Sequence, residues 1–172
     1  LPIWSASDNF GMGSPLPGLY HRLFYMMSGA VYAVTSNSKV SIALTLIAFT
    51  SIGVYSVFLL LRSFNSTVFV SLLGSSVLPF LNYSVTNWLV RGAMAEYSAM
   101  MLVPLFLLII KRSFDRSLLY GRIGLIFGFL FLAHSVIAYF TALLTGFTMI
   151  GCCLLGLSTW QMFPLRKVCY AV

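Results

Sequence analysis

The charged residues of this chain are confined to short clusters between long apolar stretches. One stretch, residues 40–61, is apolar or weakly polar throughout and is flanked by Lys39 and Arg62. A helix needs about 20 such residues to cross the roughly 30 Å hydrocarbon core of a bilayer. Only 8% of the 172 residues are charged and 60% are hydrophobic, whereas an average soluble domain is about 25% charged. The pattern predicts a polytopic membrane protein and excludes a water-soluble enzyme and a disordered chain.

Further apolar stretches follow at 66–85, 93–110 and 118–157. The last is too long for one span, because at about 1.5 Å per residue it would reach about 60 Å. The chain must turn back near His134 or near Gly146, and periodicity does not choose; we divide the stretch into 118–134 and 135–157. No alternation typical of barrel strands is present. We therefore predict an all-α transmembrane bundle of about five spans within residues 36–172.

The basic residues favour one orientation of this bundle. If every stretch crosses the bilayer, the sparser side holds only Arg22, Lys39 and Arg91. The other side holds Arg62, Lys111, Arg112, Arg116, Arg122, Arg166 and Lys167. By the positive-inside rule the richer side is cytoplasmic. We expect a multi-pass protein of the cytoplasmic (inner) membrane, whose net charge of +7 reflects topology and not nucleic-acid binding.

Residues 1–35 differ in kind from the bundle. Residues 1–17 are loop-like, and Pro17 opens an amphipathic helix that runs to about Val34. Several polar and aromatic residues share one stripe of this helix: His21, Tyr25, Ser28 and Tyr32. We expect an extracytoplasmic loop followed by an interfacial helix in the outer leaflet. The alternative is a sixth full span.

Glu96 is the most informative ionisable residue. It lies about one turn inside the stretch 93–110, and an ionised acid at a helix centre in a bilayer costs about 2.5–3.5 kcal/mol. Its neighbours Gly92, Ala93 and Ala99 are small and allow another backbone to approach. The carboxylate is therefore expected to face protein or a water-filled cavity. It is either a site carboxylate or a structural partner of an arginine, Arg91 or Arg22.

Four other residues are expected at the same outer end. Arg91 precedes a helix, where free N–H groups and the helix dipole favour an anion, so it could hold a lipid phosphate or contact headgroups generally. His21 and Arg22 carry the same ambiguity. His134 is accessible if the chain turns there, and is a buried packing residue if it does not. The absence of metal-ligand spacing and of a phosphate loop predicts no metal site and no evident cofactor, with a divalent cation left open.

Short motifs in chain order resemble those of a known family. They are Leu1-Pro2-Ile3-Trp4 with Gly11-Met12-Gly13-Ser14-Pro15, Arg91-Gly92-Ala93-Met94-Ala95-Glu96 followed by Pro104-Leu105, and Ala133-His134. They are similar to motifs of the YfhO-like, or pyruvoyl-tetrahydropterin-synthase-related, bacterial membrane proteins, which relate to the GT-C glycosyltransferase fold. The chain departs from the family pattern at Tyr20-His21-Arg22-Leu23, where the family often has Pro before Leu.

The resemblance implies transfer of a sugar from a polyprenyl-phosphate donor to an acceptor on the extracytoplasmic face. Glu96 and His21 are then the candidate catalytic residues. The candidates for binding substrate or the lipid phosphate are Arg91, Arg22, Tyr20, Tyr25 and His134. The partners it implies are membrane lipids and a polyprenyl-phosphate-linked sugar.

The chain opens with Leu1 and no signal-like segment, so we expect a piece of a longer protein that packs against its other transmembrane segments. The key acidic residue of GT-C enzymes lies in an outer loop that would precede Leu1, and Asp8 is not at its usual place. Two alternatives remain open. One is a non-catalytic scaffold subunit with the same fold, and the other is a transporter, which spans interrupted at Pro79 and Pro104 would suit.

Overall fold

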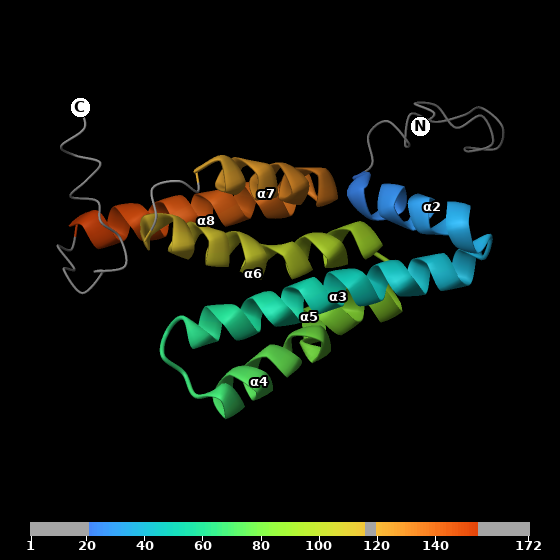
Figure 1. Ribbon diagram of the computed structural model, residues 1–172. Helices are drawn as coiled ribbons and strands as arrows, with labels where there is room; N and C mark the ends of the chain where they lie inside the picture. The colour runs from blue at the N-terminus through green and yellow to red at the C-terminus, as the bar shows by residue number, and fades with distance from the viewer. Residues whose placement is uncertain (1–20, 116–119, 155–172) are drawn as a thin grey trace.

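The computed structural model describes residues 21–115 and 120–154, and within these ranges every regular element is a helix (Figure 1). The elements in chain order are α2 (Leu23–Thr35), α3 (Ser38–Arg62), α4 (Val68–Ser76), η2 (Leu78–Phe80), α5 (Asn82–Val85), η3 (Thr86–Val90), α6 (Met94–Asp115), α7 (Tyr120–Ala133) and α8 (Ser135–Leu154). The prediction of an all-α architecture is confirmed for the described residues.

Three helical segments among the described residues are long and apolar enough to cross a membrane. They are Ser38–Arg62, Val68–Val90 and Met94–Arg112. A membrane protein is therefore supported by helix length and composition. The apolar segments Gly121–Ala133 and Ser135–Gly151 are shorter, so the total of five spans stays a prediction. The chain turns between α7 and α8 at His134, the first of the two positions that the sequence left open.

Helix α2 packs antiparallel to the first half of α3. The rings of Phe24 and Phe49 lie 6.1 Å apart, and the hydroxyls of Ser28 and Ser41 are 3.0 Å apart. Within the described residues α2 begins at Leu23 and runs back alongside α3 (Figure 1). The interfacial position of this helix, like the alternative of a sixth span, stays a prediction.

The residues of the polar-aromatic stripe have different surroundings on α2. Ser28 is buried against α3, whereas Tyr25 and Tyr32 are exposed. The residues of α2 that are buried are Leu23, Phe24 and Ser28. The side of α2 that packs is the one on which Phe24 meets Phe49 and Ser28 meets Ser41 across the small-residue face of α3.

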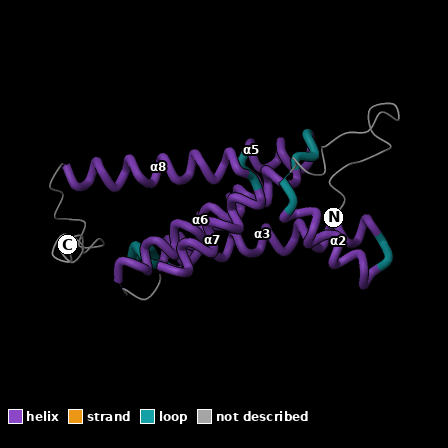
Figure 2. Tube along the Cα trace, turned by 90° about the horizontal axis from the view of Figure 1, so that it is seen from above, coloured by secondary structure: helices purple, strands orange, loops and turns teal. Residues whose placement is uncertain are grey.

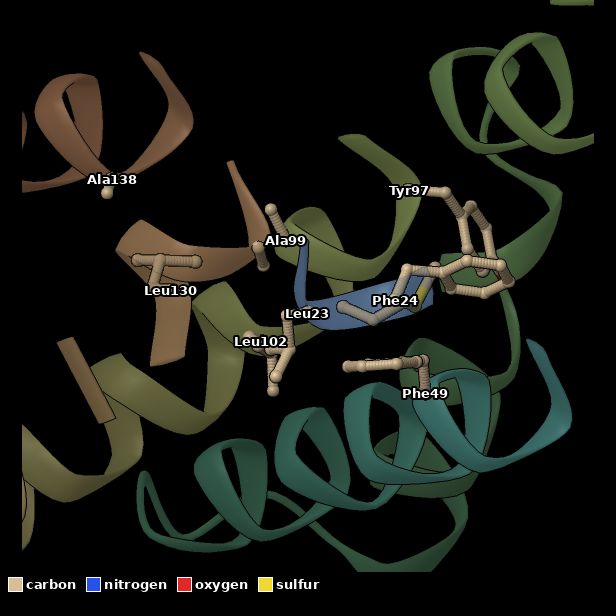
Figure 3. Packing of buried hydrophobic residues seen from close by; sticks show 10 residues of the cluster. Leu23, Phe24, Phe49, Tyr97, Ala99, Leu102, Leu130 and Ala138 are labelled. Carbon is tan, nitrogen blue, oxygen red and sulfur yellow. The ribbon is translucent and has the colours of Figure 1, made fainter. Parts of the chain in front are cut away.

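The bundle core lies where α3 and α6 pack in parallel. The buried face of α3 consists mainly of small residues at intervals of three or four positions: Ser41, Thr45, Phe49, Gly53 and Ser56. A Cβ on Gly53 would lie 2.7 Å from the Sδ and 3.0 Å from the carbonyl oxygen of Met101, so the two backbones are in close contact. Small residues permit such an approach between membrane helices. Phe24, Tyr97, Leu102 and Leu130 extend the core toward α2 and α7 (Figure 3).

The second span is broken. Pro79 lies in the short 3-10 turn η2, which separates α4 from α5, and α5 continues into the π-helical turn η3. Proline has no N–H to donate and disrupts a continuous helix. The hydroxyl of Ser84 donates to the carbonyl oxygen of Leu78 at 2.7 Å. A side chain of the break therefore satisfies a backbone carbonyl within it.

Gly92 reverses the chain between the second and third spans. It has φ +64°, in the left-handed region that glycine adopts at little cost. Several helix ends lie together toward one end of the bundle (Figure 1). They are the starts of α3, α6 and α8 and the ends of η3 and α7. We call this the Glu96 end. From there α8 diverges from α6 and α7 (Figure 2).

Candidate functional site

Glu96 is held at the first turn of α6 by two neighbours. Arg91 Nη1 lies 3.4 Å from its Oε2, and the hydroxyl of Tyr83 donates to its Oε1. The free N–H groups at the start of α6 also favour a negative charge. Of the two arginines that the sequence offered as partners, the structure places Arg91 against the carboxylate. The side chain of Glu96 is 16% exposed, whereas that of Arg91 is 55% exposed.

Asn87 is the fourth residue of the hydrogen-bonded group around Glu96, and it contacts Arg91. Its side chain is fully buried, and its Oδ1 accepts a hydrogen bond from Arg91 Nη1 at 3.2 Å. Its backbone carbonyl accepts from the N–H of Ala93 at 2.7 Å, which fixes the turn at Gly92. Its Nδ2 meets no hydrogen-bond acceptor among the described residues. We call Tyr83, Asn87, Arg91 and Glu96 the Glu96 network.

Sequence reasoning missed Tyr83 and Asn87. Both lie in the second span, which was predicted only as a weak apolar stretch. A signal was present, since positions 83, 87 and 91 are spaced by four and fall on one helical face. The π-helical turn shifts this alignment slightly, as the N–H of Arg91 bonds to the carbonyl of Thr86 at 2.8 Å.

His21 and His134 contact each other at the same end of the bundle. Their ring centroids are 4.1 Å apart and the planes are nearly perpendicular, at 79°. Burial lowers the pKa of both imidazoles. The pKa of His134 is lowered further by the neighbouring His21 and raised by the charge of Glu96. We call these two residues the histidine pair; it lies near enough to Glu96 to be influenced by its charge.

The remaining predicted site residues are placed differently. The backbone N–H of Arg22 donates to the carbonyl of Leu132 at 3.2 Å, which ties the start of α2 to the end of α7. Tyr25 is 47% exposed on α2, and its ring meets Phe24 edge-on at 5.5 Å. Tyr20 lies outside the described residues.

An apolar groove lies beside the Glu96 network, between α3 and the broken second span. Its volume is about 360 Å³. The hydroxyls of Thr50 and Tyr97, 2.7 Å apart, are among its few polar groups. Two lining residues, Trp88 and Tyr97, are the chain neighbours of Asn87 and Glu96. The groove is lined by Leu46, Ile47, Thr50, Ser51, Pro79, Phe80, Trp88 and Tyr97.

The arrangement could accommodate an anionic, amphipathic ligand. In the part of the chain that the structure describes, no group of three or more His, Cys, Asp or Glu side chains could hold a metal. An exposed guanidinium suits a phosphate or carboxylate, and a concave apolar surface suits a hydrocarbon chain. Comparisons of the chain with models of known families, with curated proteins and with solved structures found no match.

Proposed function

We propose that this chain is part of a glycosyltransferase-like membrane protein that takes a sugar from a polyprenyl-phosphate donor. The observation that carries the proposal is the partly exposed Arg91 beside the half-buried Glu96, next to an apolar groove. A lipid-linked sugar has the matching parts, which are a hydrocarbon chain, a phosphate and a polar ring. The resemblance of the segment from Arg91 to Glu96 to the GT-C-related family adds a reason to choose this amphipathic ligand class.

Each part of the arrangement has a chemical role in this proposal. The isoprenoid chain would occupy the groove near Ile47 and Phe80. The exposed N–H groups of the Arg91 guanidinium would donate to phosphate oxygens, while Nη1 continues to donate to Asn87 Oδ1. Displacement of Arg91 toward the phosphate would free Glu96 to accept the proton of an acceptor hydroxyl, which is general-base catalysis. His21 and His134 would line the sugar side of this site.

The membrane orientation is part of the same proposal. With the Glu96 end on the extracytoplasmic side, Lys111 and Arg112 at the other end of α6 would face the cytoplasm, as the positive-inside rule requires. The reaction would then take place at the outer face of the cytoplasmic membrane, where polyprenyl-linked sugars and membrane lipids are the partners.

One observation favours a second candidate, a non-catalytic scaffold subunit. Arg91, Tyr83 and the start of α6 already satisfy the Glu96 carboxylate, as expected of a structural ion pair in a membrane. In that case the Glu96 network would hold the Gly92 turn in place and bind no substrate.

The test uses membranes that contain the full chain. Transfer of a radiolabelled sugar from a polyprenyl-phosphate donor is measured together with crosslinking of a benzophenone-bearing polyprenyl phosphate. We expect Glu96→Gln to lower turnover by about 10²-fold or more with unchanged crosslinking, and Arg91→Gln to lower crosslinking. Arg122→Gln is the matched control, since Arg122 is exposed near the start of α7.

The outcomes separate the two candidates. Normal turnover by Glu96→Gln would remove Glu96 from the reaction. A scaffold predicts no crosslinking in the unmodified chain, and a loss of folded protein in both Glu96→Gln and Arg91→Gln.

A further inference from the structure

The start of α8 is capped by two imidazole nitrogens from distant parts of the chain. The first N–H groups of any helix have no partner within the helix. In α8 the N–H of Ser135 donates to His21 Nε2 at 3.3 Å, and the N–H of Ile137 donates to His134 Nδ1 at 3.4 Å. Side chains in this role are usually hydroxyls, amides or carboxylates, which do not gain a charge near neutral pH. A histidine side chain, in contrast, gains a positive charge in this pH range.

Both hydrogen bonds require neutral rings. A ring nitrogen that accepts an N–H bond carries no proton, so the geometry assigns His21 as the Nδ1–H tautomer and His134 as the Nε2–H tautomer. A second proton on either ring would convert the acceptor into a donor. It would also place a positive charge at the positive end of the α8 dipole, beside a second ring only 4.1 Å away.

Among the described residues, groups of both signs act on that charge, and the carbonyl end of α7, directly before His134, favours it. From α6, Glu96 acts on His134 and favours its protonated form. Arg22 adjoins His21 in the chain and opposes a further positive charge. Helix α7 contributes Arg122 near its far end, about 18 Å along the helix at 1.5 Å per residue, and α8 contributes the neutral hydroxyl of Tyr139. Within the described residues, the carboxylate that acts on His134 is Glu96, which is itself paired with Arg91.

The histidine pair also lies at a mechanically decisive place. His134 is the only residue between α7 and α8; its N–H bonds to Leu130 and its carbonyl accepts from Ala138, at 2.9 and 3.0 Å. His21 and Arg22 bring the start of α2 to this connection, through Ser135 and Leu132. Loss of the cap would release α2 and the first turn of α8 from each other.

We propose that the histidine pair is an acid-sensitive latch: protonation of His21 or His134 uncaps α8 and loosens the Glu96 end where α2, α7 and α8 meet. Because burial holds the pKa of both rings below 6.5, the latch is closed at neutral pH. It opens as the pH falls through the lowered pKa values. Histidine is the side chain suited to such a switch.

Hydrogen exchange of the full chain in lipid nanodiscs tests the latch. We expect the protection factors of the amides from Ser135 to Ala138 to fall about tenfold or more between pH 7.5 and pH 5, because local opening of the first turn exposes these amides to exchange. Amides around Met101, in the core of α6, serve as the internal reference. Unchanged protection at the start of α8 would overturn the proposal.

A double variant identifies the sensor. In His21→Gln/His134→Asn the Gln Oε1 and Asn Oδ1 lie where Nε2 and Nδ1 were, so both caps remain while neither side chain gains a proton. We expect its protection factors to be independent of pH over this range. An undiminished acid response in the double variant, or a response abolished by Glu96→Gln alone, would show that the histidines are not the sensor.

A measurement on the unmodified chain covers the case in which the double variant does not fold. The ¹⁵N shifts of the two imidazoles report their protonation directly. Protonation of both rings with full protection at Ser135 and Ile137 would refute the latch, and loss of protection in step with protonation is the expected result.

Discussion

The Arg91 guanidinium lies 3.4 Å from the Glu96 carboxylate, across the chain reversal at Gly92. The two residues flank the turn between the second and third spans, so the ion pair closes the turn from outside. The arginine remains 55% exposed and the carboxylate is 16% exposed. The pair therefore combines a structural role with an open cationic surface.

The left-handed conformation at Gly92 predicts a specific cost. Gly92→Ala should destabilise the folded chain by about 1–2 kcal/mol, because a Cβ in this region clashes with the backbone. The measurement is unfolding in mixed micelles by added SDS. Gly29→Ala is the control, as Gly29 lies within α2 with no atom within 4 Å of a new Cβ, and alanine there should stabilise the helix slightly. Equal effects of the two variants would contradict the role of the turn.

The contact between α3 and α6 predicts sensitivity at Gly53. Gly53→Ala should cost about 1–3 kcal/mol, typical of added volume in a packed interface, because its Cβ would approach both the side chain and the carbonyl of Met101. The same SDS titration checks it. Gly128→Ala on α7, where a Cβ meets nothing within 4 Å, should be close to neutral. A neutral Gly53→Ala would mean that α3 and α6 are less closely packed.

The hydroxyl of Tyr83 predicts an effect of similar size. Tyr83→Phe removes one hydrogen bond to a carboxylate that keeps Arg91, so we expect a loss of stability of about 1.5–3 kcal/mol at most, the usual range for a bond to a charged group. If the site transfers sugar, the variant should also lower turnover less than Glu96→Gln does. An unchanged stability of Tyr83→Phe would show that the ring, which phenylalanine keeps, and not the hydroxyl holds the network.

The histidine pair predicts how stability depends on pH. A group whose pKa is lower in the folded than in the unfolded chain binds fewer protons when folded, so stability rises with pH through this window. The thermal unfolding midpoint of the full chain should therefore decrease as the pH is lowered from 7 to 5. The change should be smaller in His134→Asn. A midpoint that rises on acidification would contradict the lowered pKa values of His21 and His134.

The helical class and its apolar segments could be predicted from sequence because both follow from the spacing of charges. The long run between Lys39 and Arg62 has no other way to satisfy its backbone in lipid than a helix. The direction of α2 could not be predicted from sequence, since it depends on how Phe24 and Ser28 fit the small-residue face of α3. That face repeats every three or four residues and is visible in the sequence only when the partner helix is known.

The candidate site was predictable in part for a similar reason. Glu96 attracts attention alone, because a carboxylate in an apolar stretch is costly. Tyr83 and Asn87 are unremarkable until the break at Pro79 and the π-helical turn bring them under Arg91. The contact of His21 with His134, 113 positions apart in numbering (134 − 21), follows from tertiary packing alone.

The break in the second span also determines how this bundle can deform. The Ser84 hydroxyl donates to the Leu78 carbonyl beside Pro79, and the backbone carbonyl of Asn87 accepts from the N–H of Ala93. Because these bonds satisfy polar groups within the break, we expect it to be rigid. We therefore expect movement at this end of the molecule to occur at His134, the single residue between α7 and α8, while the break in the second span keeps its shape.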